Sequence, residues 1–213
     1  MVGRLLVSSL VVALCCGLAS GAAAAKRKPR RQQHVTIFSD SVGAALNWDS
    51  TAKRIVEHGN HVLFELHPCG RLVQLGCVTP PPPSVLGTVR TLGRRIGPTV
   101  VVFLGYNDSP LIYRNGMPVV LRAMRRRGVK HVIWLTLRAL NKQYADINEA
   151  IYAAERKWRS RMTVLDWNHY SSSHTSWYAE DGIHLSGTGA IAFATYLHRS
   201  LKRLGLTGPL RAG

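Results

Sequence analysis

Short apolar runs alternate with longer segments of helical periodicity along most of the chain. The short runs are rich in Val, Ile and Leu, and most are apolar at nearly every position, which is typical of strands buried on both faces. We therefore predict five strands. They span Val35–Phe38, His61–Leu66, Thr99–Leu104, Lys130–Leu137 and Met162–Asp166.

The longer segments carry apolar residues at helical spacing. In the last of them Ala190, Ile191, Ala194, Leu197 and Leu201 recur at that spacing, and Leu204-Gly205 supplies a stop. Five helices are predicted on this basis. They span Val42–Glu57, Ser84–Arg95, Met117–Arg127, Ala145–Arg159 and Gly187–Leu204.

This alternation of strands and helices predicts an α/β fold with a parallel sheet. Strands joined in this way need right-handed crossovers, and ligands of such folds bind outside the carboxyl ends of the strands. Two connections, His67–Pro83 and Trp167–Ile183, exceed the usual length, as functional loops often do. Any active site is therefore expected just after the strands.

The first 25 residues differ from the rest. Arg4 is their only charge, residues 5–18 are nearly all apolar and residues 22–25 are small, which is the pattern of a secretory signal cleaved near Ala25. An uncleaved anchor formed by residues 5–25 is the alternative, since this run is long enough to cross a bilayer. Either reading predicts a secreted, periplasmic or cell-envelope protein. The expected organisation is a signal or anchor at 1–25, a basic linker at 26–33, one domain at 34–206 and a tail at 207–213.

The charge balance favours anionic partners. The 213 residues include 28 Lys and Arg against 11 Asp and Glu, a net charge of +17. Such a surplus attracts anionic wall polymers, phospholipid headgroups or nucleic acid without choosing among them. Basic stretches such as Arg122–Arg127 lack interleaved aromatic residues that would stack on bases, so nucleic-acid binding is not expected as the main function. The oligomeric state is not predicted.

Two cysteines remain once the first 25 residues are set aside. Cys69 and Cys77 lie in the long loop after the second strand, and in an oxidising compartment a disulfide between them would staple that loop. Two unpaired, buried cysteines are the alternative. A metal site is not expected, because one cysteine pair and the scattered His58, His61 and His67 lack a completing set of ligands.

Residues suited to acyl transfer follow the first and third predicted strands. Ser39-Asp40-Ser41 places a hydroxyl at a strand-to-helix turn, where backbone donors gather, although a plain helix cap would use the same residue types. Gly105-Tyr106-Asn107-Asp108 offers an Asn side chain that can donate to an oxyanion, or it forms a simple turn.

A carboxylate and an imidazole precede the last predicted helix. In Asp181-Gly182-Ile183-His184 the carboxylate lies three residues before the histidine, with a Gly that lets it turn back onto Nδ1 and leaves Nε2 free to face a serine. A capping pair or a metal-like pair is the alternative. Before this segment, Trp167, Tyr170, Trp177 and Tyr178 form either a wall for a sugar or acyl group or ordinary loop packing. Arg138, after the fourth strand, lies near the same edge without an assigned role.

Taken together, these three segments resemble the SGNH (GDSL-like) hydrolase superfamily of serine esterases, exported bacterial members above all. The resemblance covers roughly residues 34–204. It implies a flavodoxin-like three-layer α/β/α sandwich around a five-stranded parallel sheet, with no metal or organic cofactor. The family's Gly-Asp-Ser motif is Ser39-Asp40-Ser41 here, so a serine replaces its glycine. This departure puts the shape of the turn, or the rate of the enzyme, in doubt.

The resemblance also implies roles for individual residues. Ser41 is the nucleophile, His184 the base that then acts as an acid, and Asp181 the residue that orients the imidazole. The oxyanion is held by the Ser41 amide, the amide of a glycine after the second strand and the Asn107 side chain. That glycine is Gly70 or Gly76, and Gly70 follows the strand more closely. Asp40, Gly105 and Asp108 are expected to support these groups.

The expected activity is hydrolysis of acyl esters, short-chain or O-acetyl esters in particular, with acylated envelope carbohydrate as one substrate class. A transacylase, in which a sugar hydroxyl replaces water, would use the same residues. The alternative from another class is a non-catalytic cell-envelope-binding module, which Ser39 and the positive charge would favour.

Overall fold

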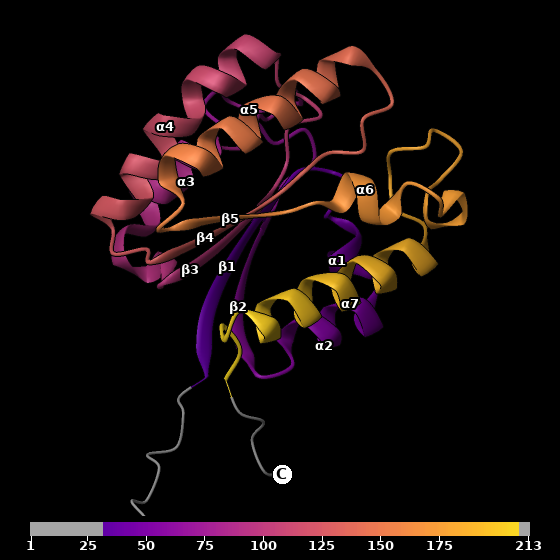
Figure 1. The fold of residues 1–213 in the computed structure, drawn as a ribbon, viewed down its shortest axis with the longest axis horizontal. Coiled ribbons are helices and arrows are strands. Elements are labelled where there is room, and N and C mark those ends of the chain that lie inside the picture. The colour runs from indigo at the N-terminus through magenta and orange to yellow at the C-terminus, as the bar shows by residue number, and fades with distance from the viewer. Residues whose placement is uncertain (1–31, 209–213) are drawn as a thin grey trace, which may run out of the picture.

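The computed structural model describes residues 32–208, which form a five-stranded parallel sheet with helices on both faces (Figure 1). The strand order is β2-β1-β3-β4-β5, as in flavodoxin-like folds. The predicted signal or anchor, most of the linker and the end of the tail lie outside the described residues. The strands are β1 (Gln33–Ser39), β2 (Asn60–Leu66), β3 (Thr99–Phe103), β4 (His131–Leu135) and β5 (Met162–Leu165).

The central strands are buried on both faces because helices cover the sheet from each side. On one side lie α1 (Ala45–Trp48), α2 (Ser50–Glu57) and α7 (Gly187–Arg203); on the other lie α3 (Val85–Leu92), α4 (Pro110–Arg126) and α5 (Lys142–Trp158) (Figure 1). The side chains of β3, and those of β1 from Val35 onward, are accordingly buried. This arrangement confirms the predicted three-layer α/β/α fold class.

The register of the sheet brings the ends of three strands level. Ser39, the last residue of β1, pairs with Leu66 of β2 on one side and with Phe103 of β3 on the other. The loops that leave these strands therefore begin side by side at one edge of the sheet. Sequence segments some 60 residues apart meet there.

Side-chain caps define where most helices begin. Asp49, Ser109 and Ser186 each accept a hydrogen bond from a backbone amide in the first turn of α2, α4 and α7. Asp49 also divides the predicted helix 42–57 into α1 and α2. Its extended backbone ends one helix while its carboxylate starts the next.

The predicted helices differ most from the structure in two segments. Helix α4 begins at Pro110 instead of Met117, because Ser109 caps a first turn that starts with a proline. The sequence did not indicate this turn, since its Leu111 is exposed and breaks the apolar periodicity. The segment 167–183, expected as a loop, contains α6 (Trp167–Ser171) and the 3₁₀ turn η2 (Thr175–Trp177). A second 3₁₀ turn, η1 (Gly93–Ile96), leads into β3. Within residues 32–208 no helix is long and apolar enough to cross a membrane.

Candidate active site

The turn after β1 carries Ser41. Its backbone is closed by a hydrogen bond of 3.1 Å from the Ala44 amide to the Asp40 carbonyl, and α1 starts only at Ala45, three residues later than predicted. Ser41 is half-buried, and within the described residues its amide has no acceptor. Both its hydroxyl and its amide are thus available to a substrate.

The loop before α7 carries Asp181 and His184, and we call it the histidine loop. Asp181 Oδ1 accepts hydrogen bonds from the Ile183 and His184 amides at 2.8 and 3.0 Å, which folds the loop back on itself. Gly182 permits this turn with a φ of +71°, a left-handed conformation that favours glycine. The loop is closed at its base by the Ala179 amide, which donates to the His184 carbonyl at 2.8 Å.

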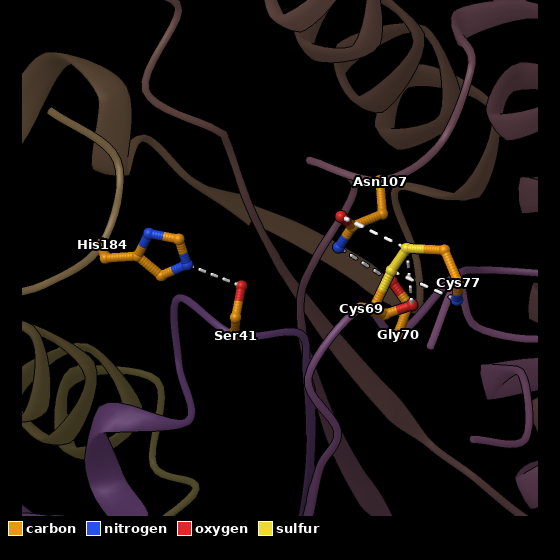
Figure 2. The surroundings of a disulfide bond; sticks show 6 residues. All are labelled: Ser41, Cys69, Gly70, Cys77, Asn107 and His184. Carbon is orange, nitrogen blue, oxygen red and sulfur yellow. Dashed lines mark hydrogen bonds between the residues drawn. A yellow bond between two sulfur atoms is a disulfide. The ribbon is translucent and has the colours of Figure 1, made fainter. Parts of the chain in front are cut away.

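The two segments meet at the side chains of Ser41 and His184 (Figure 2). Ser41 Oγ lies 2.9 Å from His184 Nε2, and His184 Nδ1 lies 2.5 Å from Asp181 Oδ2. A neutral imidazole that donates through Nδ1 to the carboxylate presents Nε2 as the acceptor for the serine proton. The hydrogen bonds of this pair lower the pKa of Asp181 to about 2, first through His184 and then through the Ile183 amide. Asp181 is therefore an anion at neutral pH.

Not all of the predicted oxyanion donors are free to bind an oxyanion. Asn107 lies on the far side of Ser41 from His184, and its Nδ2 donates to the Gly70 carbonyl at 3.5 Å (Figure 2). The Gly70 amide, however, donates to the His67 carbonyl at 2.8 Å, and the Gly76 amide donates to the Pro82 carbonyl at 2.9 Å. Neither glycine amide is free in this conformation, so the role of Gly70 stays a prediction that needs a local rearrangement.

Comparison with solved structures identifies the fold. The lipase/acylhydrolase from Enterococcus faecalis matches with a TM-score of 0.62 and 15% identity over 84% of this chain and 100% of that one. A member of the lipolytic G-D-S-L family from Veillonella parvula matches with a TM-score of 0.58 and 14% identity, covering 80% and 99%. The chain has the SGNH hydrolase fold. A family 3 carbohydrate esterase from Clostridium thermocellum shares it, with a TM-score of 0.57 and 12% identity over 84% and 100% of the two chains.

Sequence comparison finds similarity over a smaller part of the chain. No protein-family model matches the chain. Staphylococcus aureus proteins whose names provisionally assign them as O-acetyltransferases are 32% identical over 59 residues, which is 28% of this chain. The chain spans about one tenth of the length of these curated relatives, since the match covers 10% of them.

Ser39 stands where the resemblance led us to expect a glycine, and the glycine at residue 43 leaves room for its side chain. Its buried hydroxyl donates to the Phe103 carbonyl and accepts from the Gly43 amide at 3.1 Å. A Cβ at Gly43 would lie closer to Ser39 Oγ than two such atoms can approach. The serine therefore fits because residue 43 is a glycine, and its hydroxyl joins β1, β3 and the turn that carries Ser41.

The Asp40 carboxylate stabilises the turn that carries Ser41 from its buried side. The side chain is fully buried, and it accepts from the Val42 amide at 3.0 Å and from the Gly105 amide at 3.2 Å. Burial raises the pKa of Asp40 to about 6. The hydrogen bonds from these two amides and from the Tyr106 amide lower it and so offset part of that rise. Gly105 has a φ of +145°, which residues with side chains rarely adopt, so this approach to Asp40 requires the glycine.

Asp108 has a similar role at the neighbouring strand end. Both of its oxygens accept from the Leu72 amide, at 3.3 and 3.2 Å, so it links the loop after β3 to the loop after β2. Burial raises the pKa of Asp108 to about 7, and the nearby Asp40 raises it further while Arg71 lowers it. The predicted supporting residues Asp40, Gly105 and Asp108 thus share one buried network beneath Ser41.

Cys69 and Cys77 form the predicted disulfide, with Cα atoms 5.4 Å apart. Cys69 has a φ of +57°, unusual for a residue with a side chain. The bond lies directly beside Gly70 and Asn107 (Figure 2). It therefore holds the segment in which the oxyanion donors are expected.

Arg138 is a site residue to which the sequence assigned no role. Its Nη1 donates to the Gly182 carbonyl at 2.7 Å, between Asp181 and His184, and its guanidinium lies 3.9 Å above the ring of Tyr178. Its own backbone amide donates to the Tyr106 hydroxyl at 2.8 Å. Arg138 therefore ties the histidine loop to the ends of β3 and β4. Its position just after a strand was the signal that the sequence contained.

The aromatic residues before the histidine loop divide between packing and exposure. Trp167 is fully buried, stacks on Trp177 with ring centroids 5.9 Å apart and contacts Phe193 of α7 at 5.4 Å. Tyr178 is also buried, whereas Tyr170 is 39% exposed. Trp167 and Tyr178 therefore belong to the core. Trp177 and Tyr170 remain accessible at its margin.

The three histidines weighed as metal ligands do not converge. His58 lies near His198, His61 packs on His34, and His67 contacts Glu65 at 3.1 Å. Among residues 32–208, no three His, Cys, Asp or Glu side chains are grouped as a metal site would require.

Proposed function

We propose that this protein is an exported serine esterase that hydrolyses short acyl esters, O-acetyl esters in particular, with Ser41, His184 and Asp181 as its triad. One observation supports it above all others. A serine hydroxyl, an imidazole and a carboxylate drawn from two distant segments lie in one hydrogen-bonded line of 2.9 and 2.5 Å on an SGNH hydrolase fold.

The reaction follows from the positions of these atoms. Ser41 Oγ attacks the ester carbonyl carbon while His184 Nε2 takes its proton, and the ionised Asp181 stabilises the imidazolium. The Ser41 amide and Asn107 Nδ2 are the donors available to the oxyanion. His184 then protonates the departing alcohol, which leaves an acyl group on Ser41. Water, deprotonated by His184, cleaves that ester and releases the acid and the free serine.

The openness of the site favours a substrate presented on a larger molecule. The side chains of His184 and Asp181 are each 47% exposed, and Leu140, which adjoins Gly182, is 50% exposed. Such a surface admits an acyl group that projects from a saccharide better than a small free ester that needs enclosure. The carbohydrate esterase among the structural neighbours supports the same substrate class. Acetylated envelope carbohydrate is thus the proposed substrate.

A transacylase is the second candidate because the Staphylococcus aureus relatives carry the name of O-acetyltransferases. In that reaction a sugar hydroxyl attacks the acyl group on Ser41 in place of water. An acetyl donor supplied with and without an added saccharide distinguishes the two, since only transfer yields an acetylated sugar.

A fluorophosphonate probe tests the proposal without knowledge of the natural substrate, because it labels only an activated serine. The full chain should be labelled, and Ser41→Ala should abolish both labelling and hydrolysis of an activated acetate ester. Ser173→Ala, which removes an exposed serine of the nearby loop, is the matched control and should keep both. An unlabelled wild-type chain would instead favour the envelope-binding module.

A further inference from the structure

Three basic segments precede three neighbouring strands of the sheet. They are residues 94–95 (RR) before β3, residues 125–130 (RRRGVK) before β4 and residues 156–161 (RKWRSR) before β5. Together they hold ten Lys and Arg residues and no Asp or Glu. We call them the basic edge.

The basic edge is one continuous surface. The Lys130 and His131 amides donate to the Pro98 carbonyl at 2.8 and 3.0 Å, which joins the loop before β4 to the loop before β3. The Val132 amide donates to the Arg161 carbonyl at 2.7 Å, which joins it to the segment before β5. Because neighbouring strands lie about 4.8 Å apart, the ten charges are held within a small area.

These charges are exposed and have no acidic partners among the described residues. Arg127 is half-buried and the other nine side chains are exposed. The ion pairs found among residues 32–208 all lie elsewhere. The helix dipole accounts for basic residues in the last turns of α4 and α5. It does not account for Lys130, Arg159 and Arg161, which lie beyond those turns. Repulsion among like charges destabilises the folded state, so folding does not explain such a cluster.

Five of the eleven acidic residues lie at the opposite edge. Asp40, Asp108, Asp166 and the pair Glu180 and Asp181 all lie after strands or in the histidine loop, on the side of the triad. The opposite edge thus carries carboxyl groups, whereas the three segments of the basic edge carry none. An anionic surface would attract the basic edge and leave Ser41 facing away from it.

The chain enters the fold beside the basic edge. Thr36 Oγ1 donates to the Ile96 carbonyl at 2.7 Å, so the first strand begins next to residues 94–95. In Figure 1 the start of β1 lies at the end of the sheet away from α6. The sequence before β1 contains Lys26, Arg27, Lys28, Arg30 and Arg31, preceded by the apolar run 5–25. A lipid bilayer is the surface that suits both an apolar run and the basic residues next to it.

We propose that the basic edge docks on an anionic phospholipid surface and holds the triad on the side away from the lipid. Nucleic acid fits this edge less well. Trp158, the aromatic residue of the segment 156–161, is half-buried against the core and offers no face on which a base could stack.

Vesicle binding by the full chain tests this proposal. Vesicles of phosphatidylcholine alone are compared with vesicles that also contain phosphatidylglycerol, and the lipid concentration for half-maximal binding is measured on each. We expect binding at least roughly tenfold tighter on the anionic vesicles, and loss of that difference in high salt. Replacement of Arg125, Arg126, Arg127 and Lys130 by Gln should remove most of the difference.

The matched control removes four charges elsewhere, with Arg54, Arg114, Lys142 and Arg199 replaced by Gln. It should keep the preference for anionic vesicles, and both variants should keep the esterase activity of the wild type. Equal loss in both variants would overturn the proposal, because net charge alone would then explain binding. So would equal binding to both kinds of vesicle. Tight binding to a soluble glycerol-phosphate wall polymer that outcompetes the vesicles would assign the edge to that polymer instead.

Discussion

Ser41 and His184 meet at a hydrogen bond of 2.9 Å, yet the two segments that carry them are held in different ways. The serine turn lies over buried polar groups, since Ser39 and Asp40 are almost fully inaccessible and each makes at least two hydrogen bonds. The histidine loop is exposed and relies on Asp181, Arg138 and a short closure at Ala179. One half of the site is thus built into the core and the other is attached to its surface.

This difference separates stability from catalysis. Changes beneath Ser41 should destabilise the whole fold, because buried groups would be left without partners. Changes in the histidine loop should alter activity while the fold remains intact. Variants of the two segments test that separation.

His184→Ala should lower kcat/KM for an activated acetate ester on the order of 10³-fold or more, because His184 is the base that lies at Ser41 Oγ among the described residues. Its free energy of unfolding should change by less than about 0.5 kcal/mol, since the side chain is 47% exposed and lies at the surface. Ester hydrolysis and urea denaturation measure the two quantities. His169→Ala, at an exposed histidine nearby, is the control and should be neutral in both. A large loss of stability in His184→Ala would contradict the comparison.

Gly43→Ala should destabilise the fold by about 3 kcal/mol, because the new methyl group collides with Ser39. Ser39→Gly added to it should restore most of that loss, since the next neighbour, Phe103 Cδ1, lies 3.6 Å away. Urea denaturation of both single variants and the double variant gives the coupling energy, which we expect at about 2 kcal/mol. If the stability changes of the two single variants simply add in the double variant, residues 39 and 43 are not coupled.

Stability should fall as pH rises from 5 to 7. Burial raises the pKa of Asp108 to about 7, so the folded chain binds a proton that the unfolded chain has already released. The stabilisation is present at low pH and is lost as pH approaches 7, by roughly 2 kcal/mol for this group. Asp108→Asn should flatten the slope in urea denaturation at several pH values, whereas Glu180→Gln in the exposed loop should not. A slope unchanged in Asp108→Asn would assign it to other groups.

Arg138→Gln should lower kcat about tenfold while KM and the free energy of unfolding change little, because the Gly182 carbonyl loses a donor that holds the loop carrying His184. Arg138→Lys should recover some of the lost kcat, since it restores a cationic donor without the planar contact to Tyr178. A residue with only a structural role would lower the unfolding midpoint and leave kcat per folded molecule intact. Steady-state kinetics with thermal melts distinguishes the two.

The fold could be predicted from the sequence because strands buried on both faces leave a plain apolar pattern, as in β3. The meeting of Ser41 with His184 was predictable in outline because carboxyl ends of parallel strands share an edge. Helix α4 was harder, since Gly116 and Pro118 interrupt its period.

Some contacts depend on distances that no local pattern encodes. The link from Arg138 to Gly182 spans 44 residues, and nothing near Arg138 in the sequence indicates its partner. The Gly70 amide is a similar case. Its residue type matches the resemblance, but its direction is set by a turn with His67 that the sequence does not reveal.

The stacked pair Trp167 and Trp177 connects the buried core to the segment that leads into the histidine loop. Two indoles at that separation couple electronically, so their near-ultraviolet circular dichroism and emission depend on the stack. Any event that lifts the segment away, such as entry of a bulky sugar, would change that signal. Near-ultraviolet circular dichroism of the unlabelled protein would thus report whether this stack is intact.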